Sequence, residues 1–310
     1  MNNIPELSIV IPVRDEEKNL VTLVNRITDT MDKIGFSFEV IFVTDINKDN
    51  TVGVLRDLNE KDVRIKFIKL SNGLGQHLAV HAGLSMIKGN AVVIMDGDLQ
   101  DYPEDISILY NKYKEGYDVV FGIKEKKNDS GLRNIFSKTF VKVLNSLSDY
   151  KLNFNTCMFR IMSKRTVEAI LKFGEREPSI TGLISIINFP TTEVLVTSGK
   201  RSAGETKYSF IRQINLAISF LLSFSTKPLR IASILGFIIS SLSFIYLIIV
   251  SIQKLFFDVS IAGWATIISL ITLFSGLQLF FLGIIGEYIG KIFMETKNRP
   301  RYFIEDRAGF

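Results

Sequence analysis

Cysteine is almost absent from this chain of 310 residues, in which Cys157 is the single example. No disulfide can therefore form within the chain, which fits a reducing compartment. Long blocks of like charge are absent too, although 37 Lys and Arg residues outnumber 32 Asp and Glu residues. Without such a block the sequence lacks the kind of tail that binds nucleic acid, so no nucleic acid partner is expected. The mild basic excess suits anionic lipids or phosphates instead.

Charged residues are missing from two long C-terminal segments, 231–253 and 259–286. A helix that crosses a bilayer needs roughly 20 apolar residues, so each segment is predicted to be a transmembrane helix. The alternative is two consecutive apolar helices inside a soluble core, which a domain of this size accommodates poorly. The positive-inside rule places both termini in the cytosol, at the inner (plasma) membrane, because basic residues gather outside the pair. These are Lys227, Arg230, Lys291, Lys297, Arg299 and Arg301.

Five parts are expected along the chain. They are a cytosolic domain over 1–210, an interfacial amphipathic segment over 211–230, the two spans over 231–253 and 259–286, and a cytosolic tail over 287–310. The interfacial segment is expected because apolar residues recur among polar ones before the first span. Such a segment would hold the cytosolic domain against the bilayer.

Short runs rich in Val and Ile alternate with helical patterns in the cytosolic part, which is typical of a parallel sheet covered by helices. The first run follows no basic region, unlike the apolar core of a secretory signal. Apolar residues at three-to-four spacing predict a helix over 17–34, with Gly35 as its C-terminal cap. The fold class is therefore α/β, with a doubly wound, mainly parallel sheet. The predicted strands are Leu7–Val13, Phe38–Val43, Ile65–Leu70, Ala91–Met95 and Asp118–Gly122.

Two carboxylates, Asp96 and Asp98, follow the fourth predicted strand. In a doubly wound sheet, ligands bind beyond the carboxyl ends of the strands. Two carboxylates there suit a hard cation, so we expect Mg or Mn, which would stabilise a diphosphate leaving group. The alternative is an ordinary acidic turn. Asp45 and Glu17 follow two other predicted strands and are candidates for contacts with the base or ribose of a nucleotide.

Several stretches resemble glycosyltransferase family 2, in the branch that makes polyprenyl-phosphate-linked sugars. The chain looks closest to the transferases of 4-deoxy-4-formamido-L-arabinose to undecaprenyl phosphate and to the bactoprenol glucosyltransferases. The Asp-x-Asp pair alone is a weak signal, whereas its combination with the membrane pair and the C-terminal tail is specific. The matching stretches are Ser8 to Asn19, Gly75 to His77, Met95 to Glu104, Gly204 to Phe210, Ser225 to Arg230 and Gly286 to Phe303.

The resemblance implies a fold of the glycosyltransferase A type and an inverting transfer from a nucleotide sugar, UDP- or dTDP-linked, to undecaprenyl phosphate. The product would serve lipopolysaccharide or another envelope glycan, and the enzyme would be a homotetramer. Pro12, Glu17, Asp45 and Asp96 are the candidates for nucleotide-sugar binding, and Asp96 and Asp98 for the metal.

The sequence departs from the family at two positions. Thr44 stands where relatives usually have the first Asp of an Asp-Asp-Gly-Ser loop, and Met158 stands where the glucosyl-transferring relatives have the Asp of Asp-Phe-Arg. Catalysis can survive Met158, because a phosphate monoester is largely a dianion at pH 7 and needs no general base. It does need positive charge to hold that phosphate. The candidates are Arg160, Arg201 and Lys207, alongside Asp96 and Asp98 in the catalytic set.

Two other functions stay open at this stage. A processive polysaccharide synthase would usually have more membrane helices and a Gln-x-x-Arg-Trp motif. A catalytically inactive, nucleotide-sugar-binding subunit would explain Thr44 and Met158. His77 and His81 stand four apart on a predicted helix, a spacing that suits zinc, although helix packing is the simpler interpretation.

Overall fold

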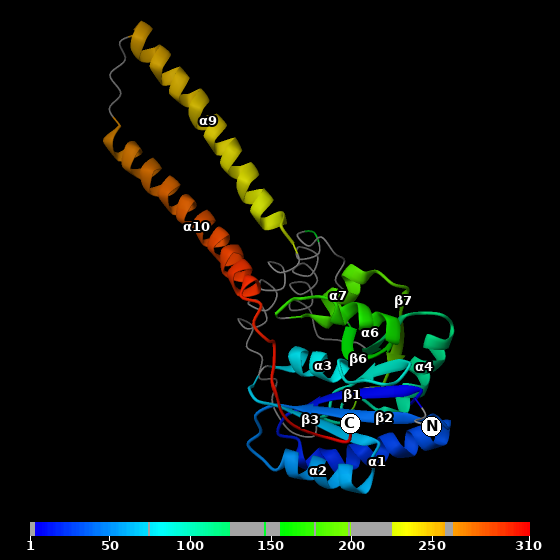
Figure 1. Ribbon diagram of the computed structural model, residues 1–310. Coiled ribbons are helices and arrows are strands. Elements are labelled where there is room, and N and C mark those ends of the chain that lie inside the picture. The colour runs from blue at the N-terminus through cyan, green and yellow to red at the C-terminus, as the bar shows by residue number, and fades with distance from the viewer. Residues whose placement is uncertain are drawn as a thin grey trace. The chain divides into compact units, whose positions relative to one another are not determined.

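The computed structural model describes residues 4–73, 75–124, 146, 156–176, 178–197, 199, 225–257 and 263–310 (Figure 1). The chain divides into two compact units. The sheet unit comprises Met1–Lys138, Lys151–Lys207 and Asn298–Phe310, and the hairpin unit comprises Thr139–Tyr150 and Tyr208–Lys297. The sheet unit is therefore built from pieces of the chain that lie on both sides of the hairpin unit in the sequence.

An eight-stranded sheet forms the centre of the sheet unit, in the order β7-β5-β6-β4-β1-β2-β3-β8. Most neighbouring strands are parallel, whereas β6 and β8 run against the strands that flank them. The expected α/β fold with a mainly parallel sheet is confirmed. The strands are β1 Leu7–Val13, β2 Phe38–Thr44, β3 Ile65–Leu70, β4 Ala91–Ile94, β5 Val119–Lys124, β6 Thr156–Ser163, β7 Thr191–Val196 and β8 Ile304–Ala308.

Helices cover both faces of this sheet (Figure 1). The two faces follow from alternation along a strand: in β1, Ile9 and Ile11 belong to one buried apolar cluster and Val10 to the other. Helices α1 Glu17–Ile34, α2 Thr51–Lys61 and α4 Ile106–Lys114 pack on the first cluster. Helices α3 Gln76–Leu84, α6 Lys164–Leu171 and α7 Ile180–Ile187 pack on the second, and a short 3₁₀ helix, η1 Pro103–Asp105, precedes α4.

Helix α1 has the bounds predicted from its apolar spacing. Its buried side chains, among them Leu20, Leu23 and Ile27, recur every three or four residues and face the sheet. Gly35 adopts a left-handed conformation, with φ of 79°, and its N–H donates to the carbonyl of Met31. A glycine reaches this conformation without the steric cost that a side chain would add, so the helix ends there.

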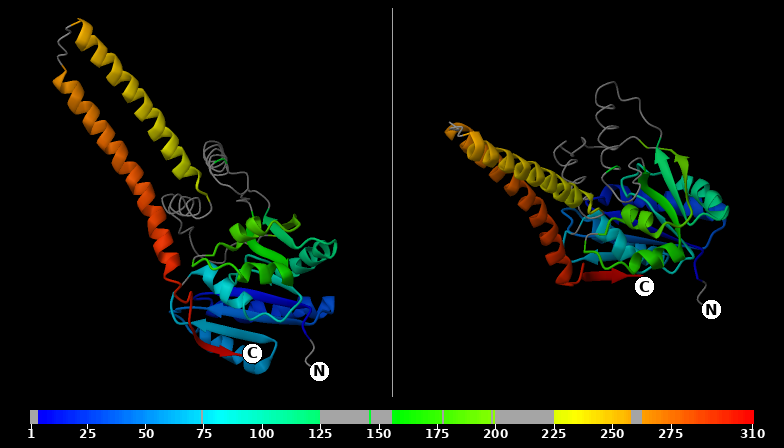
Figure 2. Two further views of the ribbon diagram at one scale, coloured as in Figure 1. Left: turned by 45° about the horizontal axis from the view of Figure 1, so that its top comes forward. Right: turned by 90° about the horizontal axis from the view of Figure 1, so that it is seen from above.

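Strand β8 comes from the C-terminal segment that was expected to be only a tail. It pairs antiparallel with β3 at the edge of the sheet, as Figure 2 shows for the last, red-coloured strand. Its sequence, Ile-Glu-Asp-Arg-Ala, is mostly charged, and every residue of the strand is exposed or half-buried, so the sequence has no alternating apolar pattern that would predict it. An edge strand with one solvated side tolerates such a composition.

The hairpin unit contains two long helices, α9 Lys227–Phe257 and α10 Trp264–Thr296. They include the segments 231–253 and most of 259–286, and both are long and apolar enough to cross a membrane. Their apolar side chains are exposed, as in Phe237 at 76% and Leu279 at 69%. Exposed apolar surface on this scale is unfavourable in water and favourable in lipid, which indicates membrane association. Within the unit, the Tyr288 hydroxyl donates to the carbonyl of Ser225 at 2.7 Å.

Candidate active site

The acidic loop after β4 lies at the carboxyl edge, by which we mean the sheet edge where β1, β2, β4 and β5 end. Gly97 is required between the two predicted ligands, because a Cβ at this position would lie 2.5 Å from Cγ1 of Val13. Asp98 accepts hydrogen bonds from the backbone N–H and the side-chain amide of Gln100, at 3.1 and 2.8 Å. Leu99 has a left-handed φ of 63°, which is uncommon for a residue with a side chain and typical of strained functional loops.

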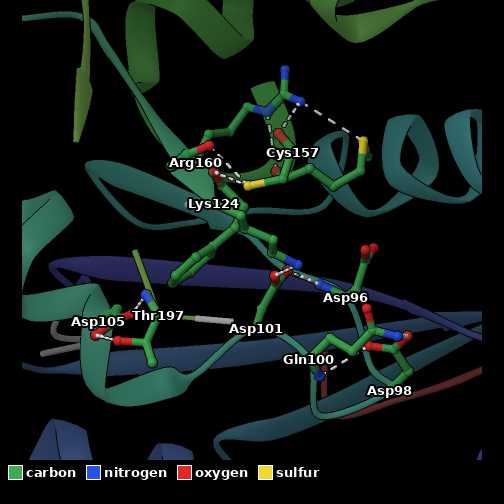
Figure 3. A network of polar contacts seen from close by, with 12 residues as sticks. Asp96, Asp98, Gln100, Asp101, Asp105, Lys124, Cys157, Arg160 and Thr197 are labelled. Atoms are coloured by element: carbon green, nitrogen blue, oxygen red, sulfur yellow. Dashed lines mark hydrogen bonds and ion pairs between the residues drawn. The ribbon is translucent and has the colours of Figure 1, made fainter. Parts of the chain in front are cut away.

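A third carboxylate, Asp101, closes this loop. It is fully buried, and its Oδ2 accepts the backbone N–H of Asp96 at 3.0 Å. Its Oδ1 lies 2.9 Å from the ammonium of Lys124, the last residue of β5. In Figure 3, Lys124 is the cation that points to Asp101. Sequence reasoning assigned no role to either residue.

Negative charge is only partly neutralised in this loop. Burial raises the pKa of Asp96 to about 7, and the neighbouring carboxylates of Asp101 and Asp98 add to the effect. Lys124 and the amide of Gln76, which donates to Asp96 Oδ1 at 2.5 Å, oppose the rise without cancelling it. A cation at Asp96 would relieve this unfavourable charge.

The carboxylates of Asp96 and Asp98 fit Mg or Mn as two of its oxygen ligands. Among the described residues, no group of three or more ligating side chains could hold a metal ion. Mg typically uses one or two carboxylates and completes its shell with waters and substrate phosphates. The donor set therefore suits a cation that binds together with a phosphorylated ligand.

Asp45 follows β2 at the same edge and keeps an unused acceptor. It is buried, its Oδ1 has no hydrogen-bond partner in the part of the chain that the structure describes, and the Nε of Arg14 is 3.8 Å from it. A buried carboxylate oxygen without a hydrogen bond is costly unless a ligand supplies a donor. Pro12 lies on β1 opposite Val43 of β2, near the carboxyl ends of both strands.

Glu17 and Thr44 have structural contacts in the same region. The Glu17 carboxylate accepts the N–H of Asn50 at 2.9 Å, and Asp49 accepts the N–H of Glu17 at 3.1 Å. These reciprocal bonds connect the loops that follow β1 and β2. Thr44 is buried, and its hydroxyl accepts a hydrogen bond from the amide of Asn47 at 2.8 Å. Thr44 therefore stabilises the loop by hydrogen bonding to Asn47.

Arg160 lies on β6 opposite Ile94, the last residue of β4, and is 1% exposed. Its guanidinium donates to the carbonyls of Met158 and Cys157, at 3.0 and 2.8 Å, and to the hydroxyl of Thr181 at 2.9 Å. These partners are all neutral. Burial lowers the pKa of Arg160 to about 10, so it stays protonated at neutral pH. A buried cation with neutral partners retains the capacity to bind an anion.

The remaining candidates fall in different places. Arg201 and Lys207 lie outside the described residues. The Nε2 of His81 lies 2.6 Å from a guanidinium nitrogen of Arg301, so this nitrogen is not available to a metal ion. Packing, the simpler interpretation of the two histidines, accounts for this contact. His77, at the start of the same helix, has its pKa lowered by burial and by Arg160.

The segment after β7 also supports the acidic loop, which the sequence did not reveal. Thr197 donates its backbone N–H to Asp105 at 2.5 Å, and Gly199 donates its own to the carbonyl of Gln100 at 3.0 Å. A Cβ on Gly199 would lie 2.8 Å from the carbonyl oxygen of Leu99. A glycine so close to a loop backbone is the only local signal that could have pointed to this contact.

Family models match both units of the chain. The model described as glycosyl transferase family 2 matches residues 8–171. A second model, described as the GtrB C-terminal hairpin, matches residues 227–292. The first match contains the acidic loop and the whole central part of the sheet, and the second contains α9 and most of α10.

Curated relatives match nearly the whole chain. An uncharacterized glycosyltransferase, YkcC, of Bacillus subtilis (strain 168) is 37% identical over 305 residues, covering 98% of this chain and 94% of the relative. An undecaprenyl-phosphate 4-deoxy-4-formamido-L-arabinose transferase of Shewanella sediminis is 34% identical, covering 98% of this chain and 93% of the relative.

Among solved structures, the glucosyl-3-phosphoglycerate synthase of Mycobacterium tuberculosis, in complex with Mn²⁺, UDP and phosphoglyceric acid, shares the fold. The TM-score is 0.51 at 16% identity, over 71% of this chain and 78% of that one.

Proposed function

Since the chain belongs to glycosyltransferase family 2, we propose that it transfers a sugar from a nucleotide sugar to undecaprenyl phosphate or a similar polyprenyl phosphate. Two features support this acceptor. The relative from Shewanella sediminis is named for transfer to undecaprenyl phosphate. The hairpin helices give the chain the membrane association that a lipid acceptor requires.

The donor is expected at the carboxyl edge of the sheet. A divalent cation held by Asp96 and Asp98 would neutralise the diphosphate and stabilise its departure. Gln76 and Asp101 orient Asp96, and the free acceptor of Asp45 is placed to receive an N–H or O–H from the nucleoside. A UDP- or dTDP-linked sugar suits this set, and the neighbouring synthase structure contains UDP and Mn²⁺.

The acceptor phosphate needs a cation and no base. As a dianion it attacks the anomeric carbon directly: a phosphate oxygen forms the new bond, and the nucleoside diphosphate leaves with the electron pair of the old one. Arg160 supplies a positive charge whose hydrogen-bond partners among the described residues are all neutral. Arg201 and Lys207 are the further candidates for this phosphate. Direct attack inverts the configuration of the sugar.

The cellular setting follows from the same proposal. The reaction takes place on the cytosolic side of the inner membrane, and the product serves lipopolysaccharide or another envelope glycan. A homotetramer is the expected assembly. The cytosolic side is supported by the basic residues that flank α9 and α10, whereas the glycan product and the homotetramer rest on the resemblance to the family.

The observation that carries the proposal is the set of three carboxylates at one loop, of which only Asp101 has a cationic partner among the described residues. Purified full-length protein, with undecaprenyl phosphate and a panel of radiolabelled nucleotide sugars, should form chloroform-soluble label in the presence of Mn²⁺. Asp98→Ala should lower the rate by at least about 100-fold, as loss of a metal ligand does.

The matched control is Asp57→Ala, which removes an exposed carboxylate from α2, away from the carboxyl edge. It should leave the rate unchanged. No label with any donor would exclude the transferase, and donor binding without transfer would instead support an inactive nucleotide-sugar-binding subunit.

A further inference from the structure

The segment that follows the second membrane helix contacts helix α3 of the sheet unit. Arg301 contacts His81 through one guanidinium nitrogen at 2.6 Å, and its other terminal nitrogen donates to the carbonyl of Phe173. Arginine has no acceptor, so Nε2 of His81 must accept, and the ring proton lies on Nδ1. His81 is buried and its pKa is lowered to about 4 by burial and by Arg301, so the contact persists at neutral pH.

The next two residues of this segment, Tyr302 and Phe303, make further hydrogen bonds to the sheet unit. The hydroxyl of Tyr302 lies 3.1 Å from that of Ser85, just beyond the end of α3. The carbonyl of Phe303 accepts the N–H of Ser71 at 3.0 Å, and β8 then pairs with β3. The segment 301–303 thus holds the side of α3 that faces away from the sheet.

The opposite side of α3 packs tightly against the sheet and has no room to move towards it. A Cβ on Gly83 would lie 2.4 Å from Cγ1 of Val10 and 2.9 Å from Cγ2 of Val43, so the helix backbone lies directly on β1 and β2. Helix α3 is therefore fixed between the sheet on one side and the returning chain on the other. Close-packed interiors transmit small displacements instead of absorbing them.

The first residue of α3 touches the active site. Gln76 donates to Oδ1 of Asp96 at 2.5 Å. His81 lies about 7.5 Å further along the helix, at 1.5 Å of rise per residue. A hydrogen bond weakens steeply when its geometry changes by a fraction of an ångström, so the position of α3 decides whether Gln76 can orient Asp96.

We propose that Arg301 is a positioning residue for the metal-binding loop, acting through His81 and α3 on the contact of Gln76 with Asp96. The proposal rests on the proposed function, in which Asp96 binds the cation. It gives the C-terminal segment a role in the site. This segment begins soon after the second membrane helix, because only Lys297 to Pro300 separate Arg301 from the end of α10. The site is complete only when this segment is present.

Full-length protein in lipid nanodiscs tests the proposal through Mn²⁺ binding, measured by the electron paramagnetic resonance signal of free Mn²⁺ with UDP or dTDP present. Arg301→Met removes the contacts with His81 and Phe173 and keeps a long side chain. It should weaken Mn²⁺ binding by about 5- to 10-fold, slightly less than the effects seen for groups that contact a metal ligand directly, because Arg301 acts through α3. The matched control is Arg307→Met, which removes the same charge from β8, where the side chain is exposed. It should leave binding unchanged.

A double-mutant cycle separates positioning from general destabilisation. Gln76→Leu alone should weaken Mn²⁺ binding by about 10-fold or more, because it deletes the contact through which Arg301 acts. Adding Arg301→Met to Gln76→Leu should then cause no further loss. Unchanged binding in Arg301→Met, or losses that multiply in the double variant, would overturn the proposal.

Tyr302→Phe covers the case in which Arg301→Met does not fold, because it keeps the ring and removes only the contact with Ser85. It should weaken Mn²⁺ binding by about 2-fold, in keeping with the loss of one neutral hydrogen bond remote from the ligand. Binding equal to that of the unmodified protein would count against the proposal. Unmodified protein that binds no Mn²⁺ would instead refute the metal role of Asp96 in the proposed function.

Discussion

Each of the two ends of the parallel strands has a carboxylate that is shielded from water, Glu39 at the amino edge and the half-buried Asp96 at the carboxyl edge, and their environments differ. At the amino edge, where β1, β2 and β3 begin, Glu39 accepts from the Ser8 hydroxyl at 2.6 Å, from the Lys66 ammonium at 2.8 Å and from the N–H of Lys88 at 2.6 Å. Burial acts to raise the pKa of Glu39, yet these hydrogen bonds hold it below its usual value. At the carboxyl edge, burial and like charges raise the pKa of Asp96 to about 7.

This difference separates stability from function. Glu39 has a donor for each side of its carboxylate, so its charge is stabilised by the fold alone. Asp96 shares its loop with two more carboxylates, and to the three together the fold supplies one ammonium and two side-chain amides. A charge that the fold leaves unbalanced is a place where a ligand gains binding energy.

Removing the charge of Glu39 should produce the largest effect on stability. Glu39→Gln leaves the buried ammonium of Lys66 without a counter-ion, and breaking a buried pair in this way costs about 3–5 kcal/mol. Because Cys157 is the single cysteine and lies on β6, a maleimide dye that fluoresces on reaction with a thiol reports thermal unfolding of the sheet unit. The exposed pair of Lys69 and Glu305, 2.5 Å apart, supplies the control Glu305→Gln, which should cost less than about 1 kcal/mol.

The same variant has a pH dependence of known sign. The pKa of Glu39 is lower in the folded state than its usual 4.5, so the pair stabilises the protein above that value. The contribution disappears as the pH falls through the folded-state pKa. The melting temperatures of the unmodified protein and Glu39→Gln should therefore differ most at pH 7 and converge in acid. A difference that stays constant to pH 3 would show that packing, and not charge, is the cause.

Neutralising Asp96 should have the opposite effect. Because the pKa of Asp96 is raised from 3.8 to about 7 in the folded state, the metal-free fold loses stability as the pH rises from about 3.8 to about 7, and the full loss is present above pH 7. In EDTA at pH 8, Asp96→Asn should melt about 2–6 °C higher than the unmodified protein, and by less at pH 5. Adding Mn²⁺ with UDP or dTDP should stabilise the unmodified protein and not the variant, which should also lack transfer activity. A lower melting temperature for Asp96→Asn at pH 8 would contradict the proposed charge imbalance.

Local patterns were sufficient to predict the parts of the sheet unit near the start of the chain. Each of the first five strands was recognised within two residues, because buried parallel strands are short runs of Val and Ile. Helix α1 was recognised with its cap, because spacing and Gly35 are both visible in the sequence. Asp96 and Asp98 were recognised as site residues because they stand where a strand ends.

Contacts between distant segments could not be predicted in this way. Lys124 contacts Asp101 only because β5 ends beside the acidic loop, and the local sequence around either residue does not predict this ion pair. The contact of Arg301 with His81 joins positions 220 residues apart in the sequence. Strand β8 has the charged composition of an edge strand, which resembles a tail until β3 is placed beside it.

The smallest expected effect concerns an exposed ion pair near the acidic loop. Arg26 of α1 donates to both oxygens of Glu104, at 2.9 and 2.6 Å, and lies over the ring of Tyr102. The side chain of Glu104 is 53% exposed, so water screens the pair, and Glu104→Gln should cost less than about 1 kcal/mol in the thiol-dye assay, and less still at high salt. Mn²⁺ affinity should be unchanged, since the contacts of Asp101 that close the loop do not involve Glu104. A several-fold loss of Mn²⁺ affinity would show that exposed charges also affect cation binding at the carboxyl edge. The difference between the environments of Asp96 and Glu39 would then not be explained by the shielded groups alone.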